Sequence, residues 1–170
     1  MNHIKLAKKL GLTFKLYNHD RSWSLYDGKI VHASTAMPDN DIDHEIGHFL
    51  AATARERTKP DWGLGRGPDY PHDEILAEFG IPDLVQRHSW DTRNNKEDEL
   101  REMREGAASL FGIAVTYTFG PKDAWRKHAD SHTWDRAGVA CDLFCLIADT
   151  DKFHLKNRLT KVLALLRSMR

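Results

Sequence analysis

Apolar residues alternate with polar ones in a few short segments near the start of the chain and recur at helical spacing elsewhere. Residues 2–10 predict a short helix that ends at Gly11. Asp27 and Gly28 form a tight-turn pair, which favours a hairpin around them. Three short strands are therefore predicted over residues 12–20, 21–28 and 29–35. Because these strands follow one another closely, we expect a small antiparallel sheet.

The rest of the chain is dominated by helical periodicity. One helix is predicted from near Asp41 or Asp43 to about Lys59, where Pro60 would stop it. Two helical turns are expected within residues 72–80, and one long helix over residues 96–115. Further helices are predicted near residues 122–129, 136–149 and 152–169. The last of these has one apolar face, made of Leu155, Leu159, Val162, Leu166 and Met169.

These elements predict an α+β fold, and 170 residues suffice for one domain with its own core. Acidic and basic residues balance at 25 each, so nothing in the net charge favours nucleic acid or an anionic membrane as a partner. The longest uncharged run, residues 106–121, is too short and too polar to span a membrane. We expect a cytoplasmic protein without a signal peptide, in which Cys141 and Cys145 are reduced thiols.

The segment "DIDHEIGHFLAA", residues 41–52, contains the pattern H-E-x-x-H. Four residues make slightly more than one helical turn, so His44 and His48 project from the same face and can share one metal ion. Glu45 lies about 100° around the helix, where it can take a proton from a metal-bound water without binding the metal. Gly47 weakens the helix, which makes sense if another part of the chain approaches closely between the histidines.

A zinc ion held by two histidines requires a third protein ligand. No further histidine follows His48 closely and no cysteine precedes it, so a glutamate on a later helix is expected. Glu105 is favoured because it shares a helix face with the small residues Ala108, Ser109 and Gly112, which would allow that face to pack on the histidine helix. Three other glutamates remain as alternatives: Glu74 first, then Glu102 and Glu78.

"HEIGH" followed by "EGAASLFG" resembles the gluzincin pattern E-x-x-A-[D/N]-x-F-A of small bacterial and phage metallopeptidases, which include regulators that cleave repressors of mobile elements. "HEIGHFLAA" with "PDWGLG" is also similar to small phage-type proteins bearing H-E-x-x-H. The resemblance covers residues 1–120 and implies a minimal zincin-like core there. From their helical pattern, residues 121–170 are expected to form an extension packed on the same domain. Ser109 stands where the family prefers Asp or Asn as a partner of a ligand.

The resemblance implies one Zn²⁺ per chain, held by His44, His48 and Glu105, with Glu45 as general base on zinc-bound water. The expected reaction is hydrolysis of a peptide bond in a cytoplasmic protein. In related sites an extended substrate adds to an edge strand, and residues 29–35 are the candidate edge. Candidates for stabilising the oxyanion are Tyr70, His72, Tyr117 and His132.

Two alternatives from other classes of function remain, and one of them is a structural protein without a metal. The same zinc-bound fold could be a non-catalytic interaction protein, encoded by a phage, that engages a host protein. The glutamate of the motif weighs against this, because a purely structural zinc site has no need of Glu45. A second metal site at His128 and His132 is not expected, since no glutamate lies between them in the catalytic position.

Overall fold

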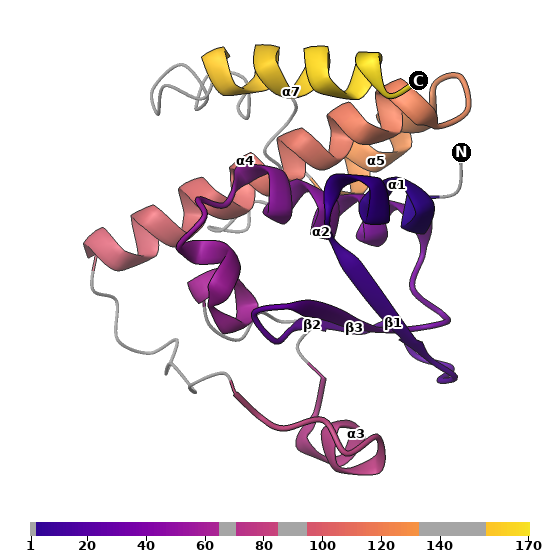
Figure 1. The fold of residues 1–170 in the computed structure, drawn as a ribbon, viewed down its shortest axis with the longest axis vertical. Helices are drawn as coiled ribbons and strands as arrows, with labels where there is room; N and C mark the ends of the chain where they lie inside the picture. Colours follow the sequence, from indigo (N-terminus) through magenta and orange to yellow (C-terminus); the bar gives the residue numbers. More distant parts are fainter. Residues whose placement is uncertain (1–2, 65–70, 85–94, 133–155) are drawn as a thin grey trace. The chain divides into compact units, whose positions relative to one another are not determined.

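The computed structural model describes residues 3–64, 71–84, 95–132 and 156–170, with side chains for all of these except residues 95–102, 131 and 132. Within these residues the fold is α+β, with a three-stranded sheet, six α-helices and two 3₁₀-helices (Figure 1). The helix expected near residues 136–149, with both cysteines, lies outside them. No helix in the described ranges is long and apolar enough to cross a membrane.

The contacts of the chain separate it into two compact units, and the division falls within one helix. One unit comprises Asn2–Ile42 and Ala52–Arg93, and contains the sheet. The other comprises Met1, Asp43–Ala51 and Asn94–Arg170, and is helical. The expected division into a core over residues 1–120 and an extension over residues 121–170 stays a prediction.

The sheet unit begins with helix α1, which ends at the predicted glycine, and continues through three strands. Its elements are α1 (His3–Leu10), β1 (Thr13–Tyr17), β2 (Ser24–Tyr26), β3 (Ile30–Ser34), η1 (Glu56–Thr58), η2 (Pro60–Gly63) and α3 (Asp73–Glu78). As predicted, Asp27 and Gly28 turn the chain between β2 and β3: the amide of Asp27 donates to the carbonyl of Ile30, and Gly28 has a φ of 97°.

The sheet is mixed, so the prediction of an antiparallel sheet was wrong for one of its two pairs. The strand order is β1-β3-β2, with β2 antiparallel and β1 parallel to β3. The tight turn pairs β2 with β3, and β1 then adds to the free side of β3. Successive strands are neighbours in only about two-thirds of cases. β3 is therefore the central strand, and the expectation that residues 29–35 form an edge was also wrong.

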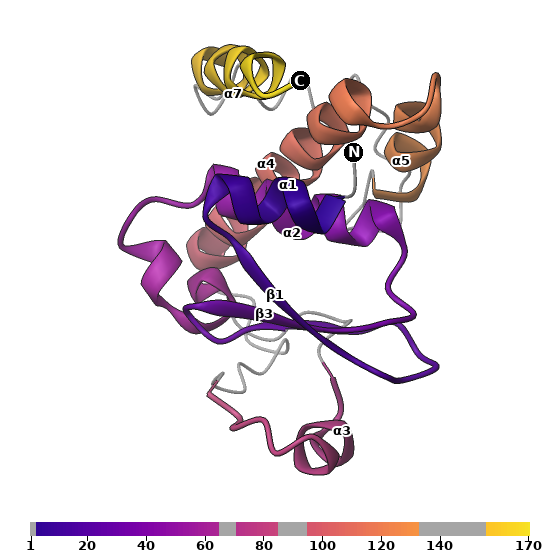
Figure 2. The same cartoon turned by 45° about the vertical axis from the view of Figure 1, so that its right-hand side comes forward.

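Helices α1 and α3 lie on opposite sides of this sheet, as the two views in Figures 1 and 2 agree. On the α3 side, Trp23 and Leu25 form one core cluster with three apolar residues of α3 and its C-terminal end: Ile75, Leu76 and Ile81. On the other side, α1 buries Leu6 and Ala7. The two turns expected within residues 72–80 are α3, and its burial against the sheet explains how so short a helix is stable.

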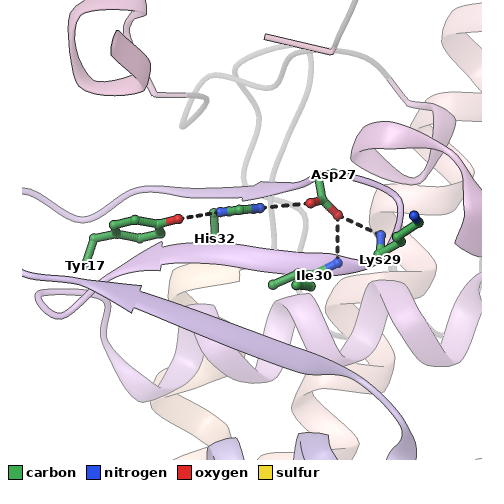
Figure 3. Close-up of polar contacts among 5 residues, drawn as sticks. All are labelled: Tyr17, Asp27, Lys29, Ile30 and His32. Carbon is green, nitrogen blue, oxygen red and sulfur yellow. Dashed lines mark hydrogen bonds and ion pairs between the residues drawn. The ribbon is translucent and has the colours of Figure 1, made fainter. Parts of the chain in front are cut away.

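A chain of hydrogen bonds crosses the sheet between Tyr17, His32 and Asp27 (Figure 3). The Tyr17 hydroxyl lies 2.8 Å from His32 Nδ1, and His32 Nε2 lies 2.9 Å from Asp27 Oδ2. A His32 ring with its proton on Nε2 satisfies both contacts. The other Asp27 oxygen accepts the backbone amides of Lys29 and Ile30 at 2.7 Å, so this carboxylate fixes both the turn and the histidine.

The helical unit is built around α4 (Asn95–Phe119), the long helix predicted over residues 96–115. It contacts α5 (Ala124–His132) and α7 (Lys156–Ser168). Ile113 of α4 packs with Ala129 of α5. Val162 and Leu166 of α7 are buried and Leu159 and Met169 are partly buried, which confirms four positions of the apolar face predicted for the last helix. The fifth, Leu155, lies outside the described residues.

Helix α2 (Asp39–Ala51) contains both histidines and is shorter at its end than predicted. It begins where the Pro38 carbonyl accepts the amides of Asp41 and Ile42. It ends at Ala51 rather than Lys59 because Thr53 starts a new turn. The Thr53 amide donates to Glu56 Oε2 at 2.7 Å and the Glu56 amide donates to Thr53 Oγ1 at 3.3 Å, a reciprocal pair typical of a helix start.

We expect Asp27→Asn to lower the stability of the protein by about 1–3 kcal/mol at neutral pH, because Asn can keep the turn but loses the acceptor for His32. Burial raises the pKa of Asp27, but hydrogen bonds from His32 and two backbone amides together lower it below its usual value. A lowered pKa gives stability that is present above the unfolded-state pKa of about 3.9 and is lost as pH falls through the folded-state pKa.

Urea denaturation of wild type and Asp27→Asn at pH 7 and at several values down to pH 3 measures this. The difference in unfolding free energy should be largest at pH 7 and narrow below about pH 4. An equal difference in unfolding free energy at every pH would mean that ionisation of Asp27 does not contribute to stability.

Candidate metal centre

The part of α2 from Asp43 to Ala51 crosses α4 so closely that the two backbones are in contact. A Cβ placed on Gly47 would lie 2.0 Å from the Ala108 carbonyl oxygen, and one on Gly112 would lie 2.8 Å from the Asp43 carbonyl oxygen. The helices run antiparallel here, since Asp43 lies opposite Gly112 while Gly47 lies opposite Ala108. The predicted close approach at Gly47 is confirmed, and the approaching element is the stripe of small residues on α4.

This crossing brings His44, His48 and Glu105 together. Their ligand atoms all lie within 4.8 Å of one another, and they are the one group of this kind among the residues that the structure describes. Glu105 Oε2 lies 3.4 Å from His44 Nε2 and 3.3 Å from His48 Nε2. The three residues could therefore hold one metal ion.

The spacing of these atoms suits a shared metal better than direct hydrogen bonds. Ligand atoms about 2.1 Å from a zinc ion at tetrahedral angles are about 3.4 Å apart. The separations of Glu105 Oε2 from the two histidine Nε2 atoms, 3.3 and 3.4 Å, match that value. Charge-assisted hydrogen bonds between imidazolium and carboxylate are shorter, about 2.7–2.9 Å. The two imidazole rings are nearly perpendicular, at 86°, with centroids 4.6 Å apart.

The electrostatics of the site favour the protonation states that a metal requires. Burial lowers the pKa of His44, and the neighbouring His48 lowers it further, against the opposing effect of Glu105. Burial raises the pKa of Glu105, but the charge of His48 and polar contacts with both rings hold it well below its usual value. A neutral imidazole and an ionised carboxylate are the forms that bind metal.

Ser109 lies behind the first histidine, at the position where the sequence resemblance expects an Asp or Asn. Its Oγ is 3.5 Å from His44 Nδ1, at the limit of a hydrogen bond. Nδ1 of His44 therefore faces Ser109, while Nε2 faces Glu105, which lies about one turn earlier on the same helix. Such contacts orient a ligating ring, and the longer reach of an Asp or Asn would do so more firmly.

The competing glutamates are placed differently. Glu74 and Glu78 are exposed on α3, and the side chain of Glu102 lies outside the described residues. Glu45 is half-buried on α2, next to the first histidine, and its charge is among those acting on the pKa of His44, after burial and Glu105.

None of the four candidates for stabilising an oxyanion is placed beside the three ligands by the part of the chain that the structure describes. Tyr70 and the side chain of His132 lie outside the described residues, and His72 is exposed. Tyr117 is 58% exposed and lies 12 residues beyond Glu105 on α4, which is about 18 Å along the helix.

A buried polar group that the sequence did not reveal lies at the other end of the crossing. Asp43 and His128 are fully buried and Thr116 is 4% exposed. Thr116 Oγ1 lies 2.6 Å from Asp43 Oδ2 and 2.5 Å from His128 Nδ1. Thr116 is 11 residues after Glu105, which is close to three full turns and puts both on the same face of the helix. This spacing was the one feature of the sequence that could have pointed to Thr116.

Helix α7 contacts the end of α2 through one basic residue. The Arg158 guanidinium donates to the carbonyl oxygens of Leu50 and Ala51 and lies 5.9 Å from the ring centre of Phe111. The last carbonyls of a helix have no partners within it and carry partial negative charge, so a cation there is favourable. One basic residue of the terminal helix thus supports the helix that contains both histidines.

Comparison of the chain with models of known protein families, with curated proteins and with solved structures found no match. The resemblance to gluzincin metallopeptidases therefore rests on the sequence motifs alone. What the structure adds is a possible metal-binding triad on two helices of an α+β fold.

We expect Gly47→Ala to destabilise the protein by about 1–3 kcal/mol or more, because the added methyl group would lie 2.0 Å from a backbone oxygen. Gly112→Ala, with 2.8 Å to its nearest backbone oxygen, should cost less. In a helix without such a contact, Gly→Ala stabilises by about 1 kcal/mol. Urea denaturation gives the change in unfolding free energy, and the sign of that change tests the prediction. A gain in stability for either variant would contradict the close crossing.

Proposed function

We propose that the protein is a zinc-dependent peptidase whose metal ligands are His44, His48 and Glu105. The single observation that supports this most is the 3.3–3.4 Å spacing of Glu105 Oε2 from both histidine Nε2 atoms. Two nitrogens and one oxygen are the ligand set of a catalytic zinc, which keeps its fourth tetrahedral position open. A structural zinc would usually have four protein ligands.

A bound zinc ion would act as a Lewis acid on the scissile carbonyl and lower the pKa of the attacking water. In this proposal the chain supplies a base and the orientation of the ligands. Glu45 would accept the proton of the attacking water and pass it to the leaving amine. Its half-buried position on α2, about 100° around the helix from His44, supports that role, because it stays accessible without taking a ligand position.

A peptide bond in a cytoplasmic protein is the proposed substrate, since the motif H-E-x-x-H combines two ligands and a base as zinc peptidases do. The zincin-like character of the core, with residues 121–170 as an extension, belongs to the same proposal. Ser109 in place of an Asp or Asn does not remove any atom that the reaction needs; it weakens the orientation of His44 only.

The proposed ligands predict the metal content of purified variants. Wild type should contain about one zinc per chain, and His44→Ala should lose it. Glu105→Gln should weaken zinc binding by more than the roughly 10–100-fold that changes behind the ligands produce. Glu74→Gln is the matched control, because Glu74 is an exposed glutamate on α3. Elemental analysis and competition with a chelator measure these values. Loss of zinc in Glu74→Gln but not in Glu105→Gln would reject the proposed third ligand.

Glu45→Gln separates catalysis from metal binding. It should keep about one zinc while cleavage of a library of unstructured peptides, followed by mass spectrometry, falls by about 10²–10⁴-fold. Glu74→Gln is again the control, and should cleave as wild type does. A zinc-loaded wild type that cleaves no more than Glu45→Gln would contradict the peptidase proposal and leave the non-catalytic interaction protein as the better account.

A further inference from the structure

We propose that Asp43, Thr116 and His128 form a positioning group that holds His44 in the geometry for metal binding. This inference rests on the proposed metal centre and assigns a role to three buried residues that the proposed reaction does not use. The Thr116 hydroxyl is the link, with Asp43 Oδ2 at 2.6 Å on one side and His128 Nδ1 at 2.5 Å on the other.

The protons of this group can be assigned from its chemistry. A hydroxyl has one hydrogen to donate and can accept as well. Thr116 donates to the carboxylate of Asp43, because a hydrogen bond to an ionised acceptor is the stronger choice. Its oxygen then accepts from His128, which must have its proton on Nδ1. The hydroxyl thus joins α2 and α5 through α4, and neither contact can be kept if the oxygen is removed.

The close crossing of α2 and α4 explains why such a group is needed. Gly47 and Gly112 allow backbone contact, but they have no side chains that could fix how far α2 slides or turns against α4. Asp43 directly precedes His44, and a Cβ on Gly112 would lie 3.1 Å from the Cα of His44. The hydrogen bond from Thr116 to Asp43 therefore fixes the helix one residue from the first ligand.

The second fixed point lies at the other end of the same face of α4. Glu105 and Thr116 are 11 residues apart, which is about 16 Å along the helix and about 20° from alignment. Glu105 contacts both histidines, and Thr116 contacts the residue before the first of them. With α2 attached to α4 at both points, a shift at Asp43 moves His44 Nε2 away from Glu105.

Thr116→Val tests the inference, because valine has the shape of threonine without its hydroxyl. Thr118→Val is the matched control: Thr118 is also buried in α4, at 5% exposure, and its Oγ1 donates to the Ala114 carbonyl of its own helix. Zinc affinity by chelator competition and the absorption spectrum of bound Co²⁺ are the measurements, with His44→Ala subtracted as background. Both report on the ligands and not on fold stability alone.

We expect Thr116→Val to lower zinc affinity about 10–100-fold and to change the Co²⁺ spectrum, as changes behind metal ligands do. Thr118→Val should change neither, and Thr116→Ser, which keeps the hydroxyl, should restore both. If wild type binds zinc and Thr116→Val equals Thr118→Val, the positioning role is wrong while the metal centre stands. If wild type takes up neither zinc nor Co²⁺, the metal centre itself is wrong, and this inference with it.

A second pair of variants applies if Thr116→Val does not fold. His128→Asn keeps a donor where Nδ1 lies, whereas His128→Leu removes it. The inference expects metal affinity close to wild type for the first and reduced for the second. Equal affinity of the two would overturn it.

Discussion

The backbone contact between α2 and α4 at Gly47 and Ala108 is the constraint on which the candidate site depends. Side chains usually hold helix axes 8–10 Å apart. Removing the side chain at the crossing lets short imidazole and carboxylate side chains from the two helices reach one point. A longer distance between the helices would leave Glu105 unable to contact both histidines. The site thus depends on the absence of a side chain at Gly47 as much as on the three ligands.

Close contact has an electrostatic cost, because it removes polar groups from water. Along the crossing three sets of polar groups have counterparts: Glu105 lies beside the two histidines, Asp43 accepts from Thr116, and Arg158 binds the terminal carbonyls of α2. The ligand-bearing part of α2 is therefore held by polar contacts near both of its ends. Apolar packing surrounds these contacts, with Ile46 and Phe111 both at 0% exposure.

Local spacing predicted the parts of this arrangement that local physics determines. The i,i+4 histidines, the small-residue stripe and the choice of Glu105 follow from helical geometry. Two other features depend on partners that are distant in sequence. The parallel pairing of β1 required the knowledge that β2 and β3 form the hairpin, and Thr116 meets Asp43 across 73 residues. The end of α2 is a different case, because its signal is local. Thr53 and Glu56 have the spacing that starts a new turn, and this turn ends the helix well before Pro60.

The shared face of α4 limits how this protein can change over time. Glu105 and Thr116 act on the same neighbouring helix, yet each residue of helix turns the next by about 100°. Inserting or deleting a single residue between them would point one of the two away from α2. Substitutions in this segment can be absorbed wherever the side chain faces elsewhere, but a change in its length cannot. The number of residues here is therefore constrained along the whole segment, whereas their identity is constrained only where they face α2 or the core.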